Sequence, residues 1–377
     1  MKRLASLLGI AAALSIGIFI ASLFDSSITP STTLVGIHTA ASTPSPSQAP
    51  HATVTSTPTV IPSSTPTPQK KTTVSTPVPT KVSVPKSATV SIPVPFPTPA
   101  SAAALDASAA ILRAALVNII CYAPQGTTLH SISGSGVFID PKGIILTNAH
   151  IAQYFLLANR DVSCIIRSGS PAVKNYNAAL MYISPVWLRA NATVLTQKTP
   201  NGTGEYDFAL LAVTKSATTA ALPSVFPSLP LAQVPPLPGT PVIIASYAAQ
   251  FLDSNQVQSS LFPTVVFGSV KDVFTFVKNT IDVLSLGGSA AAQEGSSGGG
   301  VAEASGMLVG TITTSTIQGD TSTRILSAIT ASYIRAEYAS ETGKALDLLL
   351  AAPTLVSVAD FTSQIPTLEA ILTAHLP

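Results

Sequence analysis

Charged side chains are scarce in this sequence. Asp, Glu, Lys and Arg make up only 10% of the 377 residues, whereas 46% of the residues are hydrophobic. The formal net charge is +2, and the lysines and arginines are scattered rather than grouped in a stripe. Because nucleic-acid-binding proteins neutralise phosphates with clustered basic residues, this composition excludes nucleic acid as an expected partner.

Cysteine and histidine are also few, with two and five residues. Their positions match no metal-ligand spacing, so we expect no metal site and no cofactor. The two cysteines, Cys121 and Cys164, lie in apolar, β-like stretches. They would pair as a disulfide in an oxidising compartment, but each also suits a small buried apolar position. The sequence leaves both interpretations open.

The N-terminus begins with two basic residues, Lys2 and Arg3, followed by an uncharged apolar run over residues 4–24. A run of about 20 residues is long enough to span a bilayer as a helix. The small-x-small cleavage site of a signal peptide is poorly matched, so a transmembrane anchor over 1–24 is favoured over a cleaved signal. Basic residues stay in the cytoplasm, which predicts an extracytoplasmic, membrane-anchored protein, or a secreted one if the segment is cleaved.

Residues 25–103 are rich in Pro, Ser and Thr. Such a segment has no hydrophobic period and cannot bury enough apolar surface to offset its loss of conformational entropy. Frequent prolines favour extended conformers, so we predict a disordered, semi-rigid stalk. Order should resume near Ala104, with a short helix before a strand over 116–122.

The region after the stalk predicts an all-β fold. Short apolar runs alternate with Gly, Pro, Asn and Ser, and no amphipathic helices separate them, which indicates a barrel or sandwich. Expected strands include residues 135–140, 144–147, 208–213, 241–246, 264–270 and 307–313. The last 39 residues have helical spacing at 340–351 and 366–376, which predicts one or two helices in a C-terminal tail over 339–377.

Three motifs carry candidate chemistry. Residues 134–150 (GSGVFIDPKGIILTNAH) form an expected hairpin that brings His150 to a strand end. Residues 205–213 (EYDFALLAV) place Asp207 before an apolar strand, with Glu205 as a nearby competitor. Residues 294–300 (EGSSGGG) place Ser297 in a glycine-rich loop, which alone would suggest only flexibility, and an apolar strand follows it.

Together the motifs resemble the trypsin/chymotrypsin-like serine proteases, and most closely their Deg/HtrA group. The order His, Asp, Ser is that of the chymotrypsin-like fold. The resemblance implies a double antiparallel β-barrel over 104–338, with the first barrel at about 115–222 and the second at about 223–338. It also implies a catalytic triad of His150, Asp207 and Ser297, and an oxyanion hole formed by the backbone N–H groups of Gly295 and Ser297. The tail is too short for a PDZ domain.

The chain departs from the family pattern beside the nucleophile. Ser296 replaces an Asp or Asn, and Gly300 replaces a Pro, so an ion pair at position 296 is not expected and the loop could be loose. Alignment through Ser297 would place Ala291 at the base of the specificity pocket, with Thr313 and Ser315 on its wall. None of these is acidic, which disfavours cleavage after Arg or Lys and favours small or medium apolar residues.

The sequence therefore predicts a serine endopeptidase that hydrolyses extracytoplasmic proteins or peptides through an acyl-enzyme. The alternative is a protease fold that has lost activity and serves as a binding or adhesion module on a membrane stalk. A third interpretation is a different β-rich protein in which the three motifs coincide by chance.

Overall fold

A computed structural model describes residues 101–197, 202–276, 279–315 and 318–376. The anchor over 1–24 and all but the last three residues of the stalk over 25–103 lie outside the described residues. Helix α1 spans Ala102–Ala115 and so begins two residues before the predicted start. The Ser101 hydroxyl caps it by accepting from the Ala104 N–H, which satisfies one of the free donors of the first turn. None of the helices in these ranges is long and apolar enough to cross a membrane.

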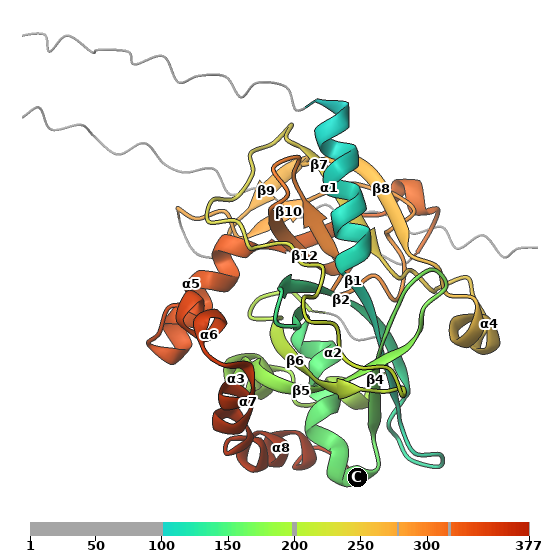
Figure 1. Cartoon of the computed structure of the whole chain (residues 1–377), viewed down its shortest axis with the longest axis vertical. Coiled ribbons are helices and arrows are strands. Elements are labelled where there is room, and N and C mark those ends of the chain that lie inside the picture. Colours follow the sequence, from blue (N-terminus) through green and yellow to red (C-terminus); the bar gives the residue numbers. More distant parts are fainter. Residues whose placement is uncertain (1–100, 198–201, 277–278, 316–317, 377) are drawn as a thin grey trace, which may run out of the picture. The chain divides into compact units, whose positions relative to one another are not determined.

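The first sheet is a closed antiparallel barrel (Figure 1). Its strand order is β1-β2-β3-β6-β5-β4, and the pairing of β1 with β4 closes it. The strands are β1 Leu116–Tyr122, β2 Ile132–Asp140, β3 Ile144–Thr147, β4 Ser163–Ser168, β5 Val173–Ile183 and β6 Ala209–Ser216. The predicted hairpin joins β2 to β3: the Asp140 side chain accepts from the Lys142 N–H, and Gly143 adopts a φ of +86°.

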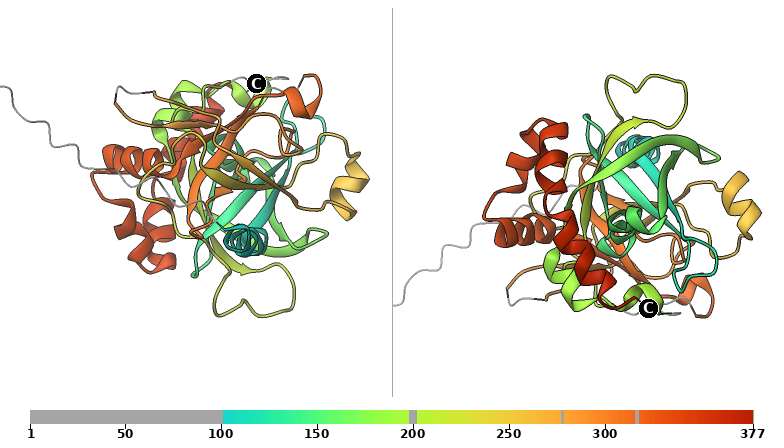
Figure 2. Two further views of the ribbon diagram at one scale, coloured as in Figure 1. Left: turned by 90° about the horizontal axis from the view of Figure 1, so that it is seen from above. Right: turned by 90° about the horizontal axis from the view of Figure 1, so that it is seen from below.

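The second sheet has seven strands and is curled (Figure 2). Its order is β8-β7-β11-β12-β13-β10-β9. The strands are β7 Pro241–Ser246, β8 Thr264–Ser269, β9 Asp272–Phe274, β10 Val283–Ser285, β11 Gly300–Ala302, β12 Leu308–Ser315 and β13 Leu326–Thr330. A closed barrel followed by a curled antiparallel sheet fits the predicted chymotrypsin-like architecture.

The short helices lie around the sheets. Within the described ranges, the α-helices after α1 are α2 Ala149–Ala152, α3 Pro185–Ala190, α4 Ser254–Ser259, α5 Ala331–Thr342, α6 Leu346–Ala351, α7 Thr354–Thr362 and α8 Ile365–Thr373. Short 3-10 segments cover Gln153–Arg160, which is kinked at Leu157, and Val194–Thr196 and Thr321–Thr323.

The C-terminal tail contains more helix than the sequence indicated. The end of α5 and all of α6, α7 and α8 fall within 339–377, where one or two helices were predicted. Helix α7 packs on β5 and β6 of the barrel, and α8 packs on α3 (Figure 2). Phe361, Leu368 and Leu372 are buried there. The periodicity missed α7 because Val356, Val358 and two threonines weaken its helical pattern.

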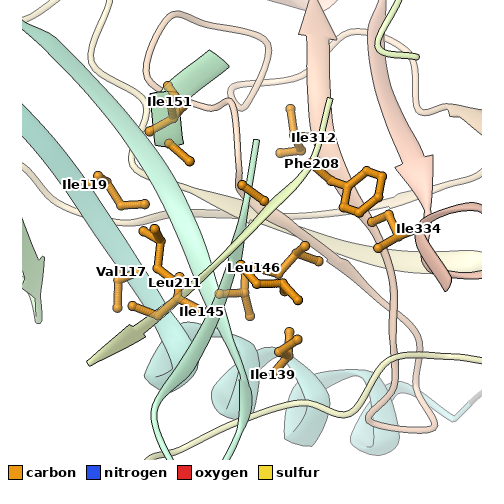
Figure 3. Packing of buried hydrophobic residues seen from close by; sticks show 14 of the residues in the cluster. Val117, Ile119, Ile139, Ile145, Leu146, Ile151, Phe208, Leu211, Ile312 and Ile334 are labelled. Carbon is orange, nitrogen blue, oxygen red and sulfur yellow. The ribbon is translucent and has the colours of Figure 1, made fainter. Parts of the chain in front are cut away.

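A hydrophobic core links both sheets. Val117, Ile145 and Leu211 fill the interior of the barrel, whereas Ile312 on β12 and Ile334 on α5 come from the second half of the domain (Figure 3). All five side chains are buried. Each fully buried aliphatic side chain contributes roughly 1.5–3 kcal/mol relative to an exposed one, so this shared core is what holds the two sheets in a fixed relation.

The two cysteines lie opposite each other on neighbouring strands. Cys121 on β1 is the direct cross-strand partner of Cys164 on β4, and a disulfide joins them. No described cysteine is free. The bond therefore spans the pair of strands at which the barrel closes.

Glu303 provides a test of how this packing responds to pH. Its carboxyl is half-buried in the turn between β11 and β12, and burial raises the pKa of Glu303, which the Ser305 hydroxyl only partly offsets. The pKa of Glu303 is therefore higher in the folded state than in the unfolded state, where it is about 4.3. The contribution of this group to the free energy of unfolding is complete below that unfolded-state pKa, and it is lost as the pH rises through the folded-state pKa. Glu303→Gln should therefore raise the melting temperature at pH 7, with the gain vanishing below about pH 4. Thermal unfolding of both proteins across this range checks it, and an equal or lower melting temperature at pH 7 would contradict it.

Candidate active site

His150 lies just beyond the end of β3, in the first turn of α2, rather than at the strand end that the sequence predicted. Two polar residues fix this turn of chain. The Thr147 hydroxyl donates to the Ser135 carbonyl at 2.7 Å, and the Asn148 amide donates to the Asp207 carbonyl at 2.8 Å. The junction between β3 and α2 is thus tied to β2 on one side and to the start of β6 on the other.

Asp207 holds His150 by two hydrogen bonds. The His150 backbone N–H donates to Oδ1 at 2.9 Å, and Nδ1 lies 2.7 Å from Oδ2. Because a carboxylate can only accept, Nδ1 carries the proton, and Nε2 is left as the acceptor. The Asp207 side chain is 7% exposed and the His150 side chain 23%. The exposed competitor, Glu205, does not take this position.

A third donor reaches the same carboxylate. The Thr313 hydroxyl on β12 donates to Asp207 Oδ2 at 2.9 Å. A buried carboxyl group without hydrogen-bond partners would be costly, and these three donors supply its partners. Gly204, at a φ of +87°, lets Thr313 come close to the segment that carries Asp207, because a Cβ at position 204 would lie 2.8 Å from the Thr313 methyl group.

The loop that carries Ser297 is ordered at every peptide. Each backbone carbonyl from residue 294 to residue 297 accepts a hydrogen bond, from the Ala249 N–H (2.8 Å), the Ser135 hydroxyl (2.8 Å), the Gly299 N–H (2.9 Å) and the Ser135 N–H (2.7 Å) in chain order. The expectation that the glycine run leaves the loop loose is therefore wrong, because contacts from other segments replace the rigidity that the glycines lack.

These contacts also orient two N–H groups. A trans peptide holds its C=O and N–H on opposite sides, so fixing the carbonyls of residues 294 and 296 fixes the N–H directions of Gly295 and Ser297. Neither N–H has an acceptor among the residues that the structure describes. Two oriented, unused donors flanking Ser296 are what an oxyanion hole requires.

The loop that carries Ser297 packs against β2 and against the end of β3, the strand that leads to His150. Gly298 has a φ of +84° and packs against Ser135 and Thr147 so closely that a Cβ would overlap the Ser135 carbonyl oxygen. Thr147 is three residues from His150. Within the described ranges no hydrogen bond joins the Ser297 hydroxyl to His150.

Among the residues predicted for the specificity pocket, Ala291 is fully buried, and Thr313 is only 5% exposed with its hydroxyl on Asp207. Thr313 therefore supports the Asp207 carboxylate. Ser315 lies on β12 opposite Leu326. Within the described residues there is no group of His, Cys, Asp and Glu placed to hold a metal ion.

The comparisons with known proteins place this site in a family. No curated protein matches the chain. Solved structures similar to it include the Rv3671c protease from M. tuberculosis in its active form, at 19% identity and a TM-score of 0.41, over 65% of this chain and 88% of that chain. An inactive form of Rv3671c is 17% identical, with a TM-score of 0.40, over 65% of this chain and 98% of that chain.

Residues 134–310 match the family model of the trypsin-like peptidase domain, which confirms the resemblance to the trypsin/chymotrypsin-like superfamily. This part of the chain is a trypsin-like peptidase domain, and the protein is a serine-type hydrolase. Its family implies proteins or peptides as substrates.

Proposed function

We propose that the protein is a serine endopeptidase with His150, Asp207 and Ser297 as its triad. The observation that carries the proposal is the bond between His150 Nδ1 and Asp207 Oδ2, because in the neutral imidazole it places the proton on Nδ1 and leaves Nε2 as the acceptor. In the proposed reaction Ser297 Oγ attacks the peptide carbonyl while Nε2 takes the serine proton. Nε2 then protonates the leaving amine, and water hydrolyses the acyl-enzyme by the same route.

The Gly295 and Ser297 N–H groups are assigned to the oxyanion. They would donate to the negatively charged oxygen of each tetrahedral intermediate, and each such donor is worth roughly 10²–10³-fold in kcat. The Asp207 carboxylate stabilises the imidazolium that forms in between, without itself taking the proton. This scheme uses only groups of the chain.

A fluorophosphonate probe tests the proposal directly, because it reacts only with an activated serine. We expect one adduct by intact mass on the full-length protein, and none on Ser297→Ala or His150→Ala. Ser305→Ala serves as the matched control, since it removes an exposed serine eight residues away and should keep the adduct. A folded parent without an adduct would favour the alternative, an inactive protease fold used for binding.

We propose in addition that the substrates are extracytoplasmic proteins and that residues 1–24 anchor the protein in the membrane. The support is the apolar run after Lys2 and Arg3, followed by the Pro/Ser/Thr-rich segment. Fractionation with an alkaline wash distinguishes the two fates of the segment: an anchored protein stays with the membranes. A cytoplasmic location of residues 101–377 would contradict the proposal.

A further inference from the structure

Ser135 is a buried polar residue of barrel strand β2 whose side chain contacts segments of the second sheet. It lies on β2 within the Gly-Ser-Gly start of the first motif, and it is fully buried. Every polar group it has is used. Its N–H donates to the Ser297 carbonyl at 2.7 Å, its hydroxyl donates to the Gly295 carbonyl at 2.8 Å, and the same hydroxyl accepts from the Tyr247 N–H at 2.8 Å.

These contacts alternate with the two donors of the proposed oxyanion hole. The Gly295 and Ser297 N–H groups belong to the peptides 294–295 and 296–297. Ser135 holds the peptide that follows each of these two, namely 295–296 and 297–298. The loop has glycines at positive φ on both sides of this stretch, at Gly295 (+87°) and Gly298 (+84°). Glycine peptides rotate with little steric resistance, so their orientation depends on external hydrogen bonds.

No charge supports the loop at position 296. The Ser296 hydroxyl is buried and bonds to the Ser246 hydroxyl at 3.0 Å, and Ser246 is followed by Tyr247, which donates to Ser135. The restraint on the loop is thus a chain of neutral hydrogen bonds that runs from β2 to the end of β7. Ser135 is the member of this chain that touches the loop twice.

We propose that Ser135 is a positioning residue: by fixing the Gly295 and Ser297 carbonyls it holds the peptide that follows each oxyanion-binding peptide, and so limits how far the oxyanion-binding peptides can turn. The inference rests on the proposed protease function. Loss of the hydroxyl leaves the part-buried Gly295 carbonyl and the buried Tyr247 N–H without their partner, and the 295–296 peptide is then free to turn. A displacement of about 1 Å at such a site costs on the order of 100-fold in rate.

The experiment compares the fluorophosphonate inactivation kinetics of the parent with Ser135→Ala. We expect the maximal rate of inactivation to fall by about 10–100-fold, with the reversible affinity for the probe changed less than about threefold. Ser135→Cys, which keeps a weaker donor of similar size, should react at an intermediate rate.

Ser108→Ala is the matched control. The Ser108 hydroxyl is also buried and donates to a backbone carbonyl, that of Glu303, which strand β11 separates from the loop. It should lower the melting temperature as Ser135→Ala does, but leave the inactivation rate within about twofold. If Ser135→Ala reacted at the parent's rate while melting lower, Ser135 would be only structural. An unlabelled parent would instead overturn the protease function itself.

Discussion

Asp207→Asn is expected to lower the rate of acylation by about 10⁴-fold. The asparagine amide carries no charge, so it cannot stabilise the imidazolium. It can also turn its NH₂ group toward Nδ1, which moves the ring proton to Nε2, where it blocks transfer of the serine proton. The His150 N–H donates to Oδ1 in the parent and so favours the amide oxygen at that position, while the Thr313 hydroxyl beside Oδ2 can turn to accept from the NH₂ group, so the local fold should be kept. The measurement is the fluorophosphonate inactivation rate.

Asp282→Asn is the control for loss of a buried carboxylate. Asp282 is buried as deeply as Asp207, and its carboxylate likewise accepts several hydrogen bonds, among them those to Oδ2 from the Thr275 hydroxyl, the Phe276 N–H and the Thr280 hydroxyl. Its replacement should lower stability and leave the acylation rate close to that of the parent. Rates for the two variants within tenfold of each other would mean that Asp207 matters for folding rather than for His150.

Strands that lie between strong turn residues were predicted best from the sequence. The bounds of β3 (Ile144–Thr147) and β7 (Pro241–Ser246) were predicted to the residue, because each is a short apolar run with turn chemistry beside it. Strand β5 (Val173–Ile183) was not among the expected strands. Its first half contains Lys174, Asn175 and Asn177, and it forms because β4 and β6 pair with it on both sides. That pairing is tertiary and leaves no local signal.

The same limit applies to the site. The three motifs identified His150, Asp207 and Ser297 as site residues, because the family pattern places each of them beside an apolar strand that can be recognised in the sequence. The partners of these residues had no such signal. Thr313 meets Asp207 across 106 residues of sequence, and Ser135 meets Gly295 across 160. A hydroxyl within an apolar strand is predicted to be buried. Its hydrogen-bond partner, however, depends on how the two sheets pack, and the spacing of residues in the sequence does not reveal that packing.

Loss of the Cys121–Cys164 disulfide is expected to lower the free energy of unfolding by about 4 kcal/mol. The bond closes a loop with a sequence separation of 43 residues, and the chain-entropy relation gives that value for a loop of this length. For a domain of this size the melting temperature should fall by roughly 10 °C. The effect should be felt by the whole barrel, because the bond lies across the β1–β4 pair where the barrel closes.

The control is the double variant Cys121→Ala with Cys164→Ala, melted with and without reductant beside the parent. Reductant should bring the oxidised parent down to near the melting temperature of the double variant, and should leave the double variant unchanged. This separates the cross-link from the packing of the buried Cys121 side chain, which both alanine substitutions also alter. A double variant that melted within about 2 °C of the oxidised parent would mean that strand pairing alone closes the barrel, and that the bond adds little to it.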